Sequence, residues 1–295
     1  MTILARTIFL AILTALFAVG CSESPGAETE IGGDQRRLAV LSPAGAIILR
    51  DLGHESRIVA RHGFDFVLDP GLPVGGDQTG LDYEALLRAQ PTDIVLEQAA
   101  IEVPRRLSEL AESRGWRVHV LPMLNLENVR DAILTLDRIA TGENTATVSG
   151  RELLAHFERS VLDQPTACRS LGRTLLVTWT DPVGVMGPGS FHADMLRSLG
   201  ATPIPEEGAP YISLDTEDVL RLDPDSIVLL MPSQDSSGVT QALGPLASVG
   251  LRAVEEGRVV LINHPHALTP STSLIEIADS LAAASAVFTI PEHAE

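Results

Sequence analysis

Lysine is absent from this 295-residue sequence, and aromatic residues make up only 4% of it. All 21 basic residues are arginines, and 39 acidic residues outnumber them to give a formal net charge of −18 at pH 7. A surplus of negative charge this large argues against nucleic acid and against an anionic membrane surface as binding partners. The hydrophobic content of 45% is nevertheless ample for a folded core.

Long apolar runs are also absent, apart from one near the N-terminus. Residues 8–19 follow Arg6 and contain a single polar residue, Thr14. This run is too short to span a bilayer comfortably and has the form of the hydrophobic region of a secretory signal peptide. We therefore predict a signal peptide over residues 1–20 and an exported protein.

Cysteine occurs only at Cys21 and Cys168. Cys21 follows the sequence AVG at 18–20, which resembles a bacterial lipoprotein cleavage box, although that box prefers Leu where Ala18 stands. We predict that Cys21 becomes the lipidated first residue of the mature chain, with ordinary secretion and no lipid as the alternative. Residues 21–36, which are rich in Ser, Glu and Gly, would form a flexible tether. Cys168 then has no partner, so an internal disulfide is excluded.

A sixteen-residue segment occurs twice. The sequence LDYEALLRAQPTDIVL at 81–96 aligns without a gap with LDTEDVLRLDPDSIVL at 214–229, and nine of the sixteen positions are identical. Each copy predicts a short helix, stopped by Pro91 or Pro224, that leads into a buried strand. A match this long at one constant offset indicates that the chain has two related halves.

Strands alternate with helices in both halves. In the first half, the predicted strands are 37–41, 57–60, 93–97 and 117–121. In the second half, they are 174–179, 226–230 and 258–262, and a helix at 273–288 closes the chain. Alternation of this kind predicts parallel sheets.

The segment between the halves carries no strand signal. Asn125 can cap a helix that runs to about residue 141, and a second helix is predicted from about 145 to 163. A helix of about 19 residues spans roughly 28 Å, which is long enough to bridge two lobes. The predicted organisation is an N-terminal lobe at 37–122, a helical linker at 123–168 and a C-terminal lobe at 169–295.

Five segments, each weak alone, occur in a specific order. They are LAVLSPAGAIILRDLG at 38–53, VGG at 74–76, the first copy of the repeat, GPGSFHADMLRSLG at 187–200 and EEGRVVL at 255–261. Together they resemble the substrate-binding proteins of bacterial ABC importers for cobalamin and iron complexes, including ferric siderophores and haem. The resemblance covers nearly all of 37–288. It implies an α/β fold of two Rossmann-like lobes with mainly parallel sheets, bridged by a long backbone helix, with the ligand in the cleft between them.

The resemblance also implies a function. The chain would be a lipid-anchored, extracytoplasmic solute-binding protein of the cell envelope. It would capture a metal chelate, namely an iron–siderophore complex, haem or cobalamin, and deliver it to the permease dimer of the inner membrane. No cofactor and no enzymatic activity are implied, and we expect a monomer that touches the membrane only through its lipid. The sequence contains no dinucleotide fingerprint, P-loop or nucleophile elbow.

Two other functions stay open at this point. One is a binding protein for a bare transition-metal cation, zinc or manganese. Related binders for these cations usually place a histidine directly after the first strand, where this chain has Ser42 and Pro43. The other is a non-transport envelope protein or an enzyme built on the same fold. Binding without turnover would distinguish the transport protein from the enzyme.

Each copy of the repeat carries a glutamate seven residues before its proline, Glu84 in the first and Glu217 in the second. In the family that the chain resembles, one exposed glutamate per lobe docks into arginine-bearing pockets of the permease dimer. The resemblance assigns that docking role to Glu84 and Glu217. The alternative is purely local, because Asp82 and Asp215 can cap the same helices and an acid in the first turn stabilises a helix by itself.

Ligands of open parallel sheets lie beyond the carboxyl ends of the strands, which selects the loops that can bind one. Trp179 is the first candidate, because it ends a predicted strand and its indole can stack on a bulky chelate. Covering the core of its own lobe is an equal alternative for Trp179. The other predicted cleft residues are Ser42, Pro43, His62, Phe66, Phe191, Tyr211, Met231, His264 and His266.

Imidazole suits iron, cobalt and zinc, so histidines in these segments are weak candidates for metal ligands. They are His62, His192, His264 and His266. No metal-spaced motif supports them, and an isolated loop histidine is more often a polar surface group. A bare-cation site would need His62 and His264 to converge with Glu97 and Asp279.

Overall fold

The computed structural model describes residues 36–97, 102–232 and 238–289, all of which belong to one structural unit. The predicted signal peptide, Cys21 and nearly all of the predicted tether lie outside these residues. Within the described ranges, no helix combines the length and the apolar character that crossing a membrane requires.

The first lobe contains a six-stranded sheet with the order β4-β3-β2-β1-β5-β6. Its strands are β1 (Leu38–Leu41), β2 (Ile58–His62), β3 (Val74–Asp77), β4 (Gly80–Leu81), β5 (Asp93–Glu97) and β6 (Arg117–Leu121). Neighbouring strands are parallel except for β3 and β4. The connecting helices are α2 (Pro43–Asp51), the short 3-10 turn η1 (Glu55–Arg57), α3 (Tyr83–Ala89) and α4 (Arg105–Arg114).

The second lobe repeats this plan with the order β10-β8-β7-β11-β12, and β9 pairs with β7. Its strands are β7 (Arg173–Thr180), β8 (Val183–Met186), β9 (Thr202–Ile204), β10 (Tyr211–Leu214), β11 (Ser226–Met231) and β12 (Val259–Asn263). The pairs that contain β8 are antiparallel, and the others are parallel. Its helical segments are α7 (Phe191–Ser198), α8 (Thr216–Leu222), α9 (Val239–Leu243), η4 (Gly244–Ser248), α10 (Arg252–Glu255) and α11 (Leu274–Ser285).

The predicted fold class, two α/β lobes with mainly parallel sheets, is confirmed. The structure adds antiparallel strands that we did not predict, namely β4, β8 and β10. Glycines conceal this part of the pattern. A Cβ at Gly184 in β8 would collide with the hydroxyl of Tyr211, and a Cβ at Gly75 in β3 would lie 2.9 Å from Leu86. Glycine permits these close approaches but removes the alternating apolar signal from the sequence.

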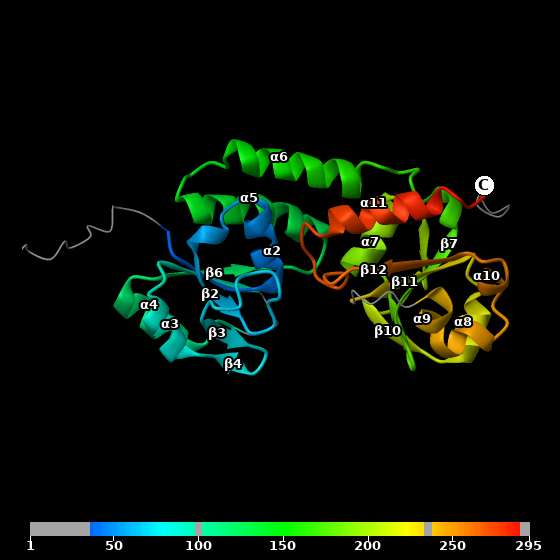
Figure 1. Cartoon of the computed structure of the whole chain (residues 1–295), viewed down its shortest axis with the longest axis horizontal. Coiled ribbons are helices and arrows are strands. Elements are labelled where there is room, and N and C mark those ends of the chain that lie inside the picture. The colour runs from blue at the N-terminus through cyan, green and yellow to red at the C-terminus, as the bar shows by residue number, and fades with distance from the viewer. Residues whose placement is uncertain (1–35, 98–101, 233–237, 290–295) are drawn as a thin grey trace, which may run out of the picture. The chain divides into compact units, whose positions relative to one another are not determined.

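The linker between the sheets is helical, as predicted. It contains α5 (Leu126–Thr141), α6 (Val148–Phe157), the π-helical turn η2 (Glu158–Leu162) and the short 3-10 turn η3 (Arg169–Leu171). Figure 1 shows α5, α6 and α11 together on one side of both sheets. The second helix starts at residue 148 and not at 145, because Thr147 is the N-cap and accepts a hydrogen bond from the Gly150 N–H. The ten residues of α6 and the five of η2 span about 22 Å.

Strand residues alternate between the two faces of each sheet. In β1, Leu38 and Val40 pack toward the helical layer of α2 and α5, while Ala39 and Leu41 pack toward α3 and α4. One apolar cluster includes strand residues of both lobes together with residues of α5, α6 and α11. The helical layer therefore joins the two sheets through a shared core and is more than a covalent connection.

The two copies of the repeat also share details of their backbone. Gln90 and Asp223 occupy the same position in each copy and are the non-glycine residues with positive φ in the described chain, at 45° and 40°. The guanidinium of Arg37 donates to the carbonyls of Ala89 and Gln90. Arg173 donates to the carbonyls of Leu222 and Asp223 in the same way. The two copies are therefore similar in backbone conformation and hydrogen bonding as well as in sequence.

Candidate functional site

A cleft of about 630 Å³ lies at the carboxyl edge of the first sheet, within the usual range for small-molecule sites. We call it the strand-end cleft. Four of the five parallel strands reach it with their last residues, and β6 reaches it with Val120, its second-last residue. Its lining residues are Leu41, Pro43, His62, Gly76–Leu81, Leu96, Glu97, Glu102–Pro104, Val120 and Leu268–Pro270. The strand order runs in opposite directions on either side of β1 and β5, so the cleft lies at the switch point where open α/β sheets bind ligands.

Ser42 and Glu97 follow or end the two strands at this switch point. The hydroxyl of Ser42 accepts the N–H of Gly45, which caps α2, and donates to Oε2 of Glu97 at 2.9 Å. Ser42 is itself fully buried, so it acts through Glu97 and does not line the cleft. Burial raises the pKa of Glu97, and the hydrogen bond from Ser42 opposes that rise.

His62 ends β2 on the other side of the switch point. Its Nδ1 accepts the N–H of Phe64 at 3.1 Å, which leaves Nε2 as the protonated nitrogen of the neutral ring. Burial lowers the pKa of His62, although the charges of Asp77 and Asp65 pull it upward. The ring is therefore neutral at pH 7 and presents an N–H donor.

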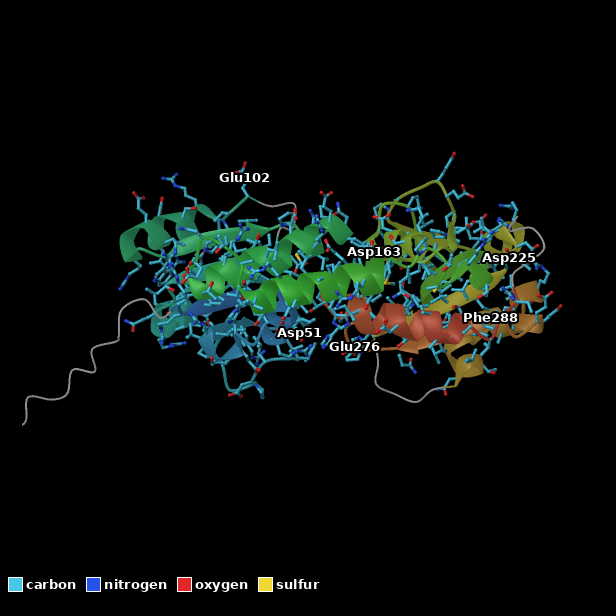
Figure 2. All side chains as sticks on the ribbon, turned by 90° about the horizontal axis from the view of Figure 1, so that it is seen from above. Asp51, Glu102, Asp163, Asp225, Glu276 and Phe288 are labelled. Atoms are coloured by element: carbon cyan, nitrogen blue, oxygen red, sulfur yellow. The ribbon has the colours of Figure 1, made fainter. Side chains whose placement is uncertain are left out.

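A second cleft, of about 430 Å³, lies between the end of α2 and residues 264–273, which follow β12. We call residues 264–273 the strap and this site the strap cleft. Its lining residues are Arg50, Asp51, Phe66, Val67, His264–His266, Thr272, Ser273 and Glu276. The hydroxyl of Thr272 donates to Asp51, which ties the strap to the first lobe. Figure 2 labels Asp51 and Glu276 at this junction of α2 and α11.

The histidines of the strap already have partners. Nδ1 of His264 accepts the N–H of His266 at 3.1 Å, so Nε2 is the nitrogen that donates to Glu276, also at 3.1 Å. Burial lowers the pKa of His266, and the neighbouring His264 and Arg50 lower it further. To bind a metal, His264 would have to give up one of these two hydrogen bonds.

The predicted cleft residues fall into three groups. Pro43 and His62 line the strand-end cleft, with Ser42 directly beneath Glu97. Phe66, His264 and His266 line the strap cleft, and Phe66 is 82% exposed. Four residues of the second lobe line neither cleft: Trp179, Phe191, Tyr211 and Met231. The strap brings residues of the second lobe to the first sheet. The position of a residue at the end of a strand does not predict this contact.

Trp179 and Tyr211 nevertheless lie on one exposed face of the second sheet. Trp179 is paired with Gly184 across β7 and β8, and the ring of Tyr211 in β10 lies over Gly184. The two side chains are 63% and 55% exposed, and the indole N–H donates to the carbonyl of Asp181 at 2.6 Å. Phe191 and Met231 are half-buried and pack against the core clusters. An exposed aromatic pair supports a stacking role for Trp179 over a core role.

The bare-cation arrangement is not present in the structure. His62 and Glu97 line the strand-end cleft, His264 lines the strap cleft, and Asp279 lies exposed on α11 outside both. His192 is fully buried, with Nε2 2.6 Å from the carbonyl oxygen of Ala267, and burial lowers its pKa to about 4. Among the described residues, no group of three or more His, Cys, Asp or Glu side chains could hold a metal ion.

Several lining residues were not predicted. Glu97 was not among the predicted cleft residues, although it ends a predicted strand and was named as a possible cation ligand. The β3–β4 turn was missed because glycine hid those strands, and Glu102 was missed because it belongs to no predicted helix or strand. Leu268–Pro270 come from the strap of the other lobe, and no local pattern points to that contact.

Glu84 and Glu217 occupy equivalent, exposed positions in the first turns of α3 and α8. Asp82 and Asp215 cap these helices by accepting the N–H groups of Ala85 and Asp218. Glu84 lies 4.0 Å from Arg88, and both side chains are more than 70% exposed. Such an exposed pair contributes little to stability, so the contact with Arg88 does not explain Glu84.

Comparison with known proteins places this geometry in context. The sequence matches the model of the periplasmic binding protein family over residues 38–265. No curated protein sequence matches it. The fold is similar to that of a possible iron-binding (periplasmic solute-binding) protein from Staphylococcus epidermidis, with a TM-score of 0.65 and 17% identity over 85% of this chain and 99% of that one.

Two further solved structures share the fold. The vitamin B12 binding protein BtuF of Vibrio cholerae has a TM-score of 0.64 and 18% identity, over 85% of this chain and 97% of its own. A periplasmic heme binding protein from Pseudomonas aeruginosa has a TM-score of 0.65 and 21% identity, over 87% of this chain and 93% of its own. The match of the family model to 38–265, on this two-lobed fold, shows that the chain belongs to the periplasmic binding protein family.

Proposed function

We propose that this protein is the solute-binding component of an ABC importer and that its ligand is a metal chelate, such as a ferric siderophore, haem or cobalamin. The observation that carries the proposal is the strand-end cleft. Its volume of about 630 Å³ suits a chelate, and it lies where all five parallel strands of the first sheet end. The absence of a metal-binding cluster among the described residues favours a ligand that brings its own coordination shell over a bare cation.

The structural neighbours support this ligand class. They are a possible iron-binding protein, a vitamin B12 binding protein and a heme binding protein, and another neighbour belongs to an Fe3+-hydroxamate transport system of Saccharomonospora viridis. Exposed aromatic side chains of the second lobe also support a chelate as the ligand. The exposed pair of Trp179 and Tyr211 offers the flat apolar surface on which a macrocycle or a hydroxamate chelate can stack.

The test is direct. Protein purified from its native envelope is examined by absorption spectroscopy, because haem and cobalamin are coloured, and the stripped protein is then titrated with haemin, cobalamin and ferric siderophores. We expect binding at micromolar or lower Kd, with a melting temperature that rises with ligand concentration. If no chelate binds at that level, the metal-chelate function is wrong.

We propose in addition that Glu84 and Glu217 dock the loaded protein on the permease. The double variant Glu84→Arg with Glu217→Arg should keep its affinity for ligand and abolish uptake, because the charges that meet basic sockets are reversed. The measurement compares Kd in solution with transport into cells or vesicles. Glu109→Arg is the matched control, since Glu109 is an exposed glutamate on α4 outside the repeat. Normal uptake by the double variant would contradict the docking role.

The lipid anchor is a separate proposal. Membership of a periplasmic binding protein family supports an extracytoplasmic location, and Cys21 with the preceding AVG sequence supports acylation at that site. Mass spectrometry of the mature N-terminus tests it. Replacement of Cys21 by Ala should release the protein from the membrane fraction without changing its Kd for ligand.

A further inference from the structure

Six of the 21 arginines lie at the amino ends of the parallel strands. They precede or begin β1, β2, β6, β7 and β12 at their amino ends, as Arg36, Arg37, Arg57, Arg117, Arg173 and Arg258. Several of them are held there by buried acids or backbone carbonyls. Arg117 is bidentate to Asp93, and Arg258 donates to the carbonyl of Asp225. These six arginines therefore lie on the side away from the carboxyl ends of the strands.

The carboxyl ends have the opposite composition. Within the described residues, the segments that follow the parallel strands are 42, 63–73, 78–79, 102–104, 122–125, 181–182, 205–210, 232, 238 and 264–273. None of these segments contains an arginine, and the chain has no lysine. Their acidic residues are Asp65, Asp69, Glu102, Asp181, Glu206 and Glu207.

The strand-end cleft shows the same imbalance locally. Its charged lining residues are Asp77, Glu97 and Glu102, and no arginine lines it among the residues that the structure describes. The nearby Arg61 does not enter the cleft, because its guanidinium donates to the carbonyls of His62, Asp65 and Pro70. The cleft therefore holds negative charge that the protein does not compensate.

The arginines of neighbouring elements are also engaged elsewhere. Arg105 pairs with Glu109 at 2.8 Å, and the guanidinium of Arg106 lies 4.3 Å from the centre of the Tyr83 ring. In the strap cleft, Arg50 forms an ion pair with Asp51 at 2.7 Å. Within the described chain, none of these three arginines lines the strand-end cleft, and each already has a partner.

Glu97 is the most constrained of the three acids. Its Oε2 is bound by Ser42, whose hydroxyl orientation is set by the capping bond from Gly45, and no described residue donates to Oε1. The neighbouring lining residues Leu41, Leu96 and Val120 are apolar, which strengthens electrostatic interactions at this point. A positioned carboxylate with a free oxygen, in a partly apolar cleft, favours a ligand N–H or ammonium group and repels a carboxylate.

We propose that the strand-end cleft selects neutral or cationic chelates and discriminates against chelates that carry free anionic groups, with Glu97 as the main specificity-determining residue. This inference rests on the proposed chelate-binding function and narrows it. Trihydroxamate chelates with an amine and corrinoids with amide side chains belong to the favoured class. Tricatecholates, ferric citrate and the dicarboxylate porphyrin of haem belong to the disfavoured class.

The test uses ligands that differ only in charge. The mature, detergent-solubilised protein is titrated with ferrioxamine B, which is cationic, with its neutral N-acetyl derivative and with its anionic N-succinyl derivative. We expect the cationic form to bind about tenfold or more tightly than the anionic form, and the ratio to shrink as ionic strength rises. Equal affinities, or tighter binding of the anionic form, overturn the proposal.

A second series of ligands, based on cobalamin, tests the proposal if the hydroxamate chelates do not fit the cleft. Cationic aquacobalamin and neutral cyanocobalamin are compared with an anionic monocarboxylic acid of cyanocobalamin. We expect the carboxylic acid to bind about tenfold more weakly than cyanocobalamin. Preferential binding of haemin, ferric citrate or a ferric tricatecholate over both series overturns the proposal.

The residue assignment is tested with a charge-matched pair of variants. Glu97→Gln should reduce the cation-to-anion affinity ratio by about threefold or more, while Glu127→Gln, an exposed glutamate at the start of α5, should leave it unchanged. Both variants remove one negative charge. If net charge alone set the selectivity, both variants would change the cation-to-anion affinity ratio equally, and the role assigned to Glu97 would be wrong. Thermal unfolding verifies that both are folded. If neither series nor haemin nor any ferric siderophore binds to the parent protein, the proposed function itself fails.

Discussion

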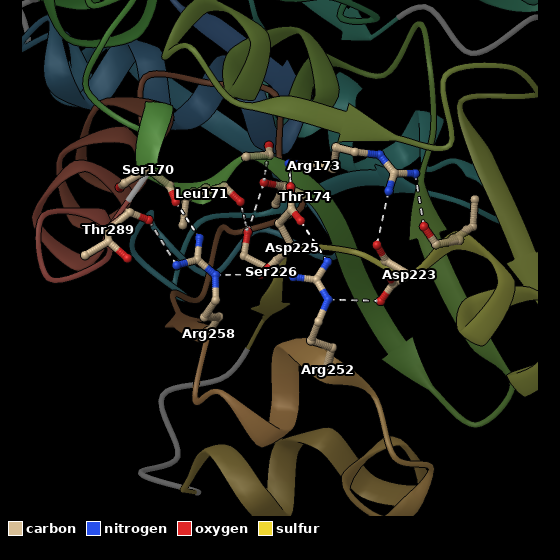
Figure 3. A network of polar contacts seen from close by, with 12 residues as sticks. Ser170, Leu171, Arg173, Thr174, Asp223, Asp225, Ser226, Arg252, Arg258 and Thr289 are labelled. Carbon is tan, nitrogen blue, oxygen red and sulfur yellow. Dashed lines mark hydrogen bonds and ion pairs between the residues drawn. The ribbon is translucent and has the colours of Figure 1, made fainter. Parts of the chain in front are cut away.

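At the scale of single residues, a network of buried charges holds the amino ends of the strands in the second lobe. Asp225 is 3% exposed and accepts the Arg173 N–H and the guanidinium of Arg252, each at 2.9 Å. Figure 3 shows this network, with Arg258 reaching across to the carbonyls of Asp225 and Ser170. These contacts join β7, β11 and the segment before β12 at their amino ends, which stabilises the fold and leaves the carboxyl ends for a ligand.

Asp225→Asn should lower the free energy of unfolding by about 2 kcal/mol at pH 7, because a charge-assisted bond to Arg252 is lost in a buried site. Burial opposes ionisation, but the bonds from Arg252 and Arg173 outweigh it and lower the pKa of Asp225. A lowered pKa contributes stability above the ordinary value of about 4, and this contribution is lost as the pH falls through the folded pKa. Urea denaturation between pH 3 and pH 7 should therefore show the difference narrowing in acid.

The matched control for this experiment is Asp223→Asn. Asp223 also meets Arg252, at 3.4 Å, but its side chain is 57% exposed. We expect a change below about 1 kcal/mol for this variant. Equal losses at the two positions, or a difference for Asp225→Asn that does not change with pH, would contradict the assigned cause.

At the scale of elements, the repeated helix–strand unit carries its strain at the same place in both lobes. Gln90 and Asp223 end α3 and α8 in the left-handed region, immediately before Pro91 and Pro224. An L-residue in that region costs about 1–2 kcal/mol, and asparagine or aspartate tolerates it better than glutamine does. The two copies therefore share one backbone conformation, but it costs more free energy at Gln90 than at Asp223.

Gln90→Gly should raise the free energy of unfolding by about 0.5 kcal/mol, because relief of the left-handed strain exceeds the entropy that glycine adds to the unfolded chain. Asp223→Gly should be close to neutral, since aspartate tolerates the conformation and its contact with Arg252 is lost. Gln90→Ala is the control, because it retains the Cβ. A stabilisation of the same size in Gln90→Ala would show that strain is not the cause.

The start of α6 depends on a buried acid. Asp137 is fully buried and accepts the N–H and hydroxyl of Thr147 and lies 3.0 Å from Nε2 of His54. A Cβ on Gly150 would lie 2.5 Å from Oδ2 of Asp137. The glycine is therefore needed for the approach of the carboxylate to the first turn of this helix.

Gly150→Ala should lower the free energy of unfolding by about 2 kcal/mol, even though alanine is the better helix former by about 1 kcal/mol, because the overlap with Asp137 must be relieved. Urea denaturation measures the change. Ser149→Ala, at the exposed neighbouring position, should be neutral or slightly stabilising. A stabilised Gly150→Ala protein would show that Asp137 can move without cost.

At the scale of the whole molecule, one apolar cluster combines residues of both sheets with the helical layer. Leu38 and Val95 come from the first sheet, and Leu176 and Val228 come from the second. A shared core of this kind makes the two lobes one cooperative unit, since neither can lose its packing without exposing surface of the other.

The two tryptophans provide a test, because Trp116 lies in the first lobe and Trp179 in the second. Trp116→Phe and Trp179→Phe each leave a single tryptophan as a reporter of one lobe. In each variant, the urea midpoint reported by that tryptophan should equal the midpoint that circular dichroism gives for the same variant. Two separate midpoints would show that the lobes unfold independently. The exposed Trp179 remains informative, because its indole loses the bond to Asp181 on unfolding.

The sequence predicted features that depend on short-range patterns, but it did not predict contacts between distant segments. The repeat and the caps at Asp82, Asp215 and Asn125 depend on short-range spacing, and the structure has them as predicted. The strands are also found, although β2 ends two residues later than predicted. Pro43 and His62 reached the strand-end cleft because strand ends determine one edge of a parallel sheet. The second lobe's Trp179 did not, because its distance from that edge depends on how the lobes pack.

The sequence by itself determined the two-lobed parallel fold, since periodicity and the repeat specify which segments form strands and helices. It also determined that arginine is the only permanently charged basic residue, because the chain contains no lysine. Only the tertiary structure decided that the strap reaches the first lobe and that Ser42 orients Glu97 from beneath. Contacts between residues distant in sequence arise from packing of the whole core, and no local pattern encodes them.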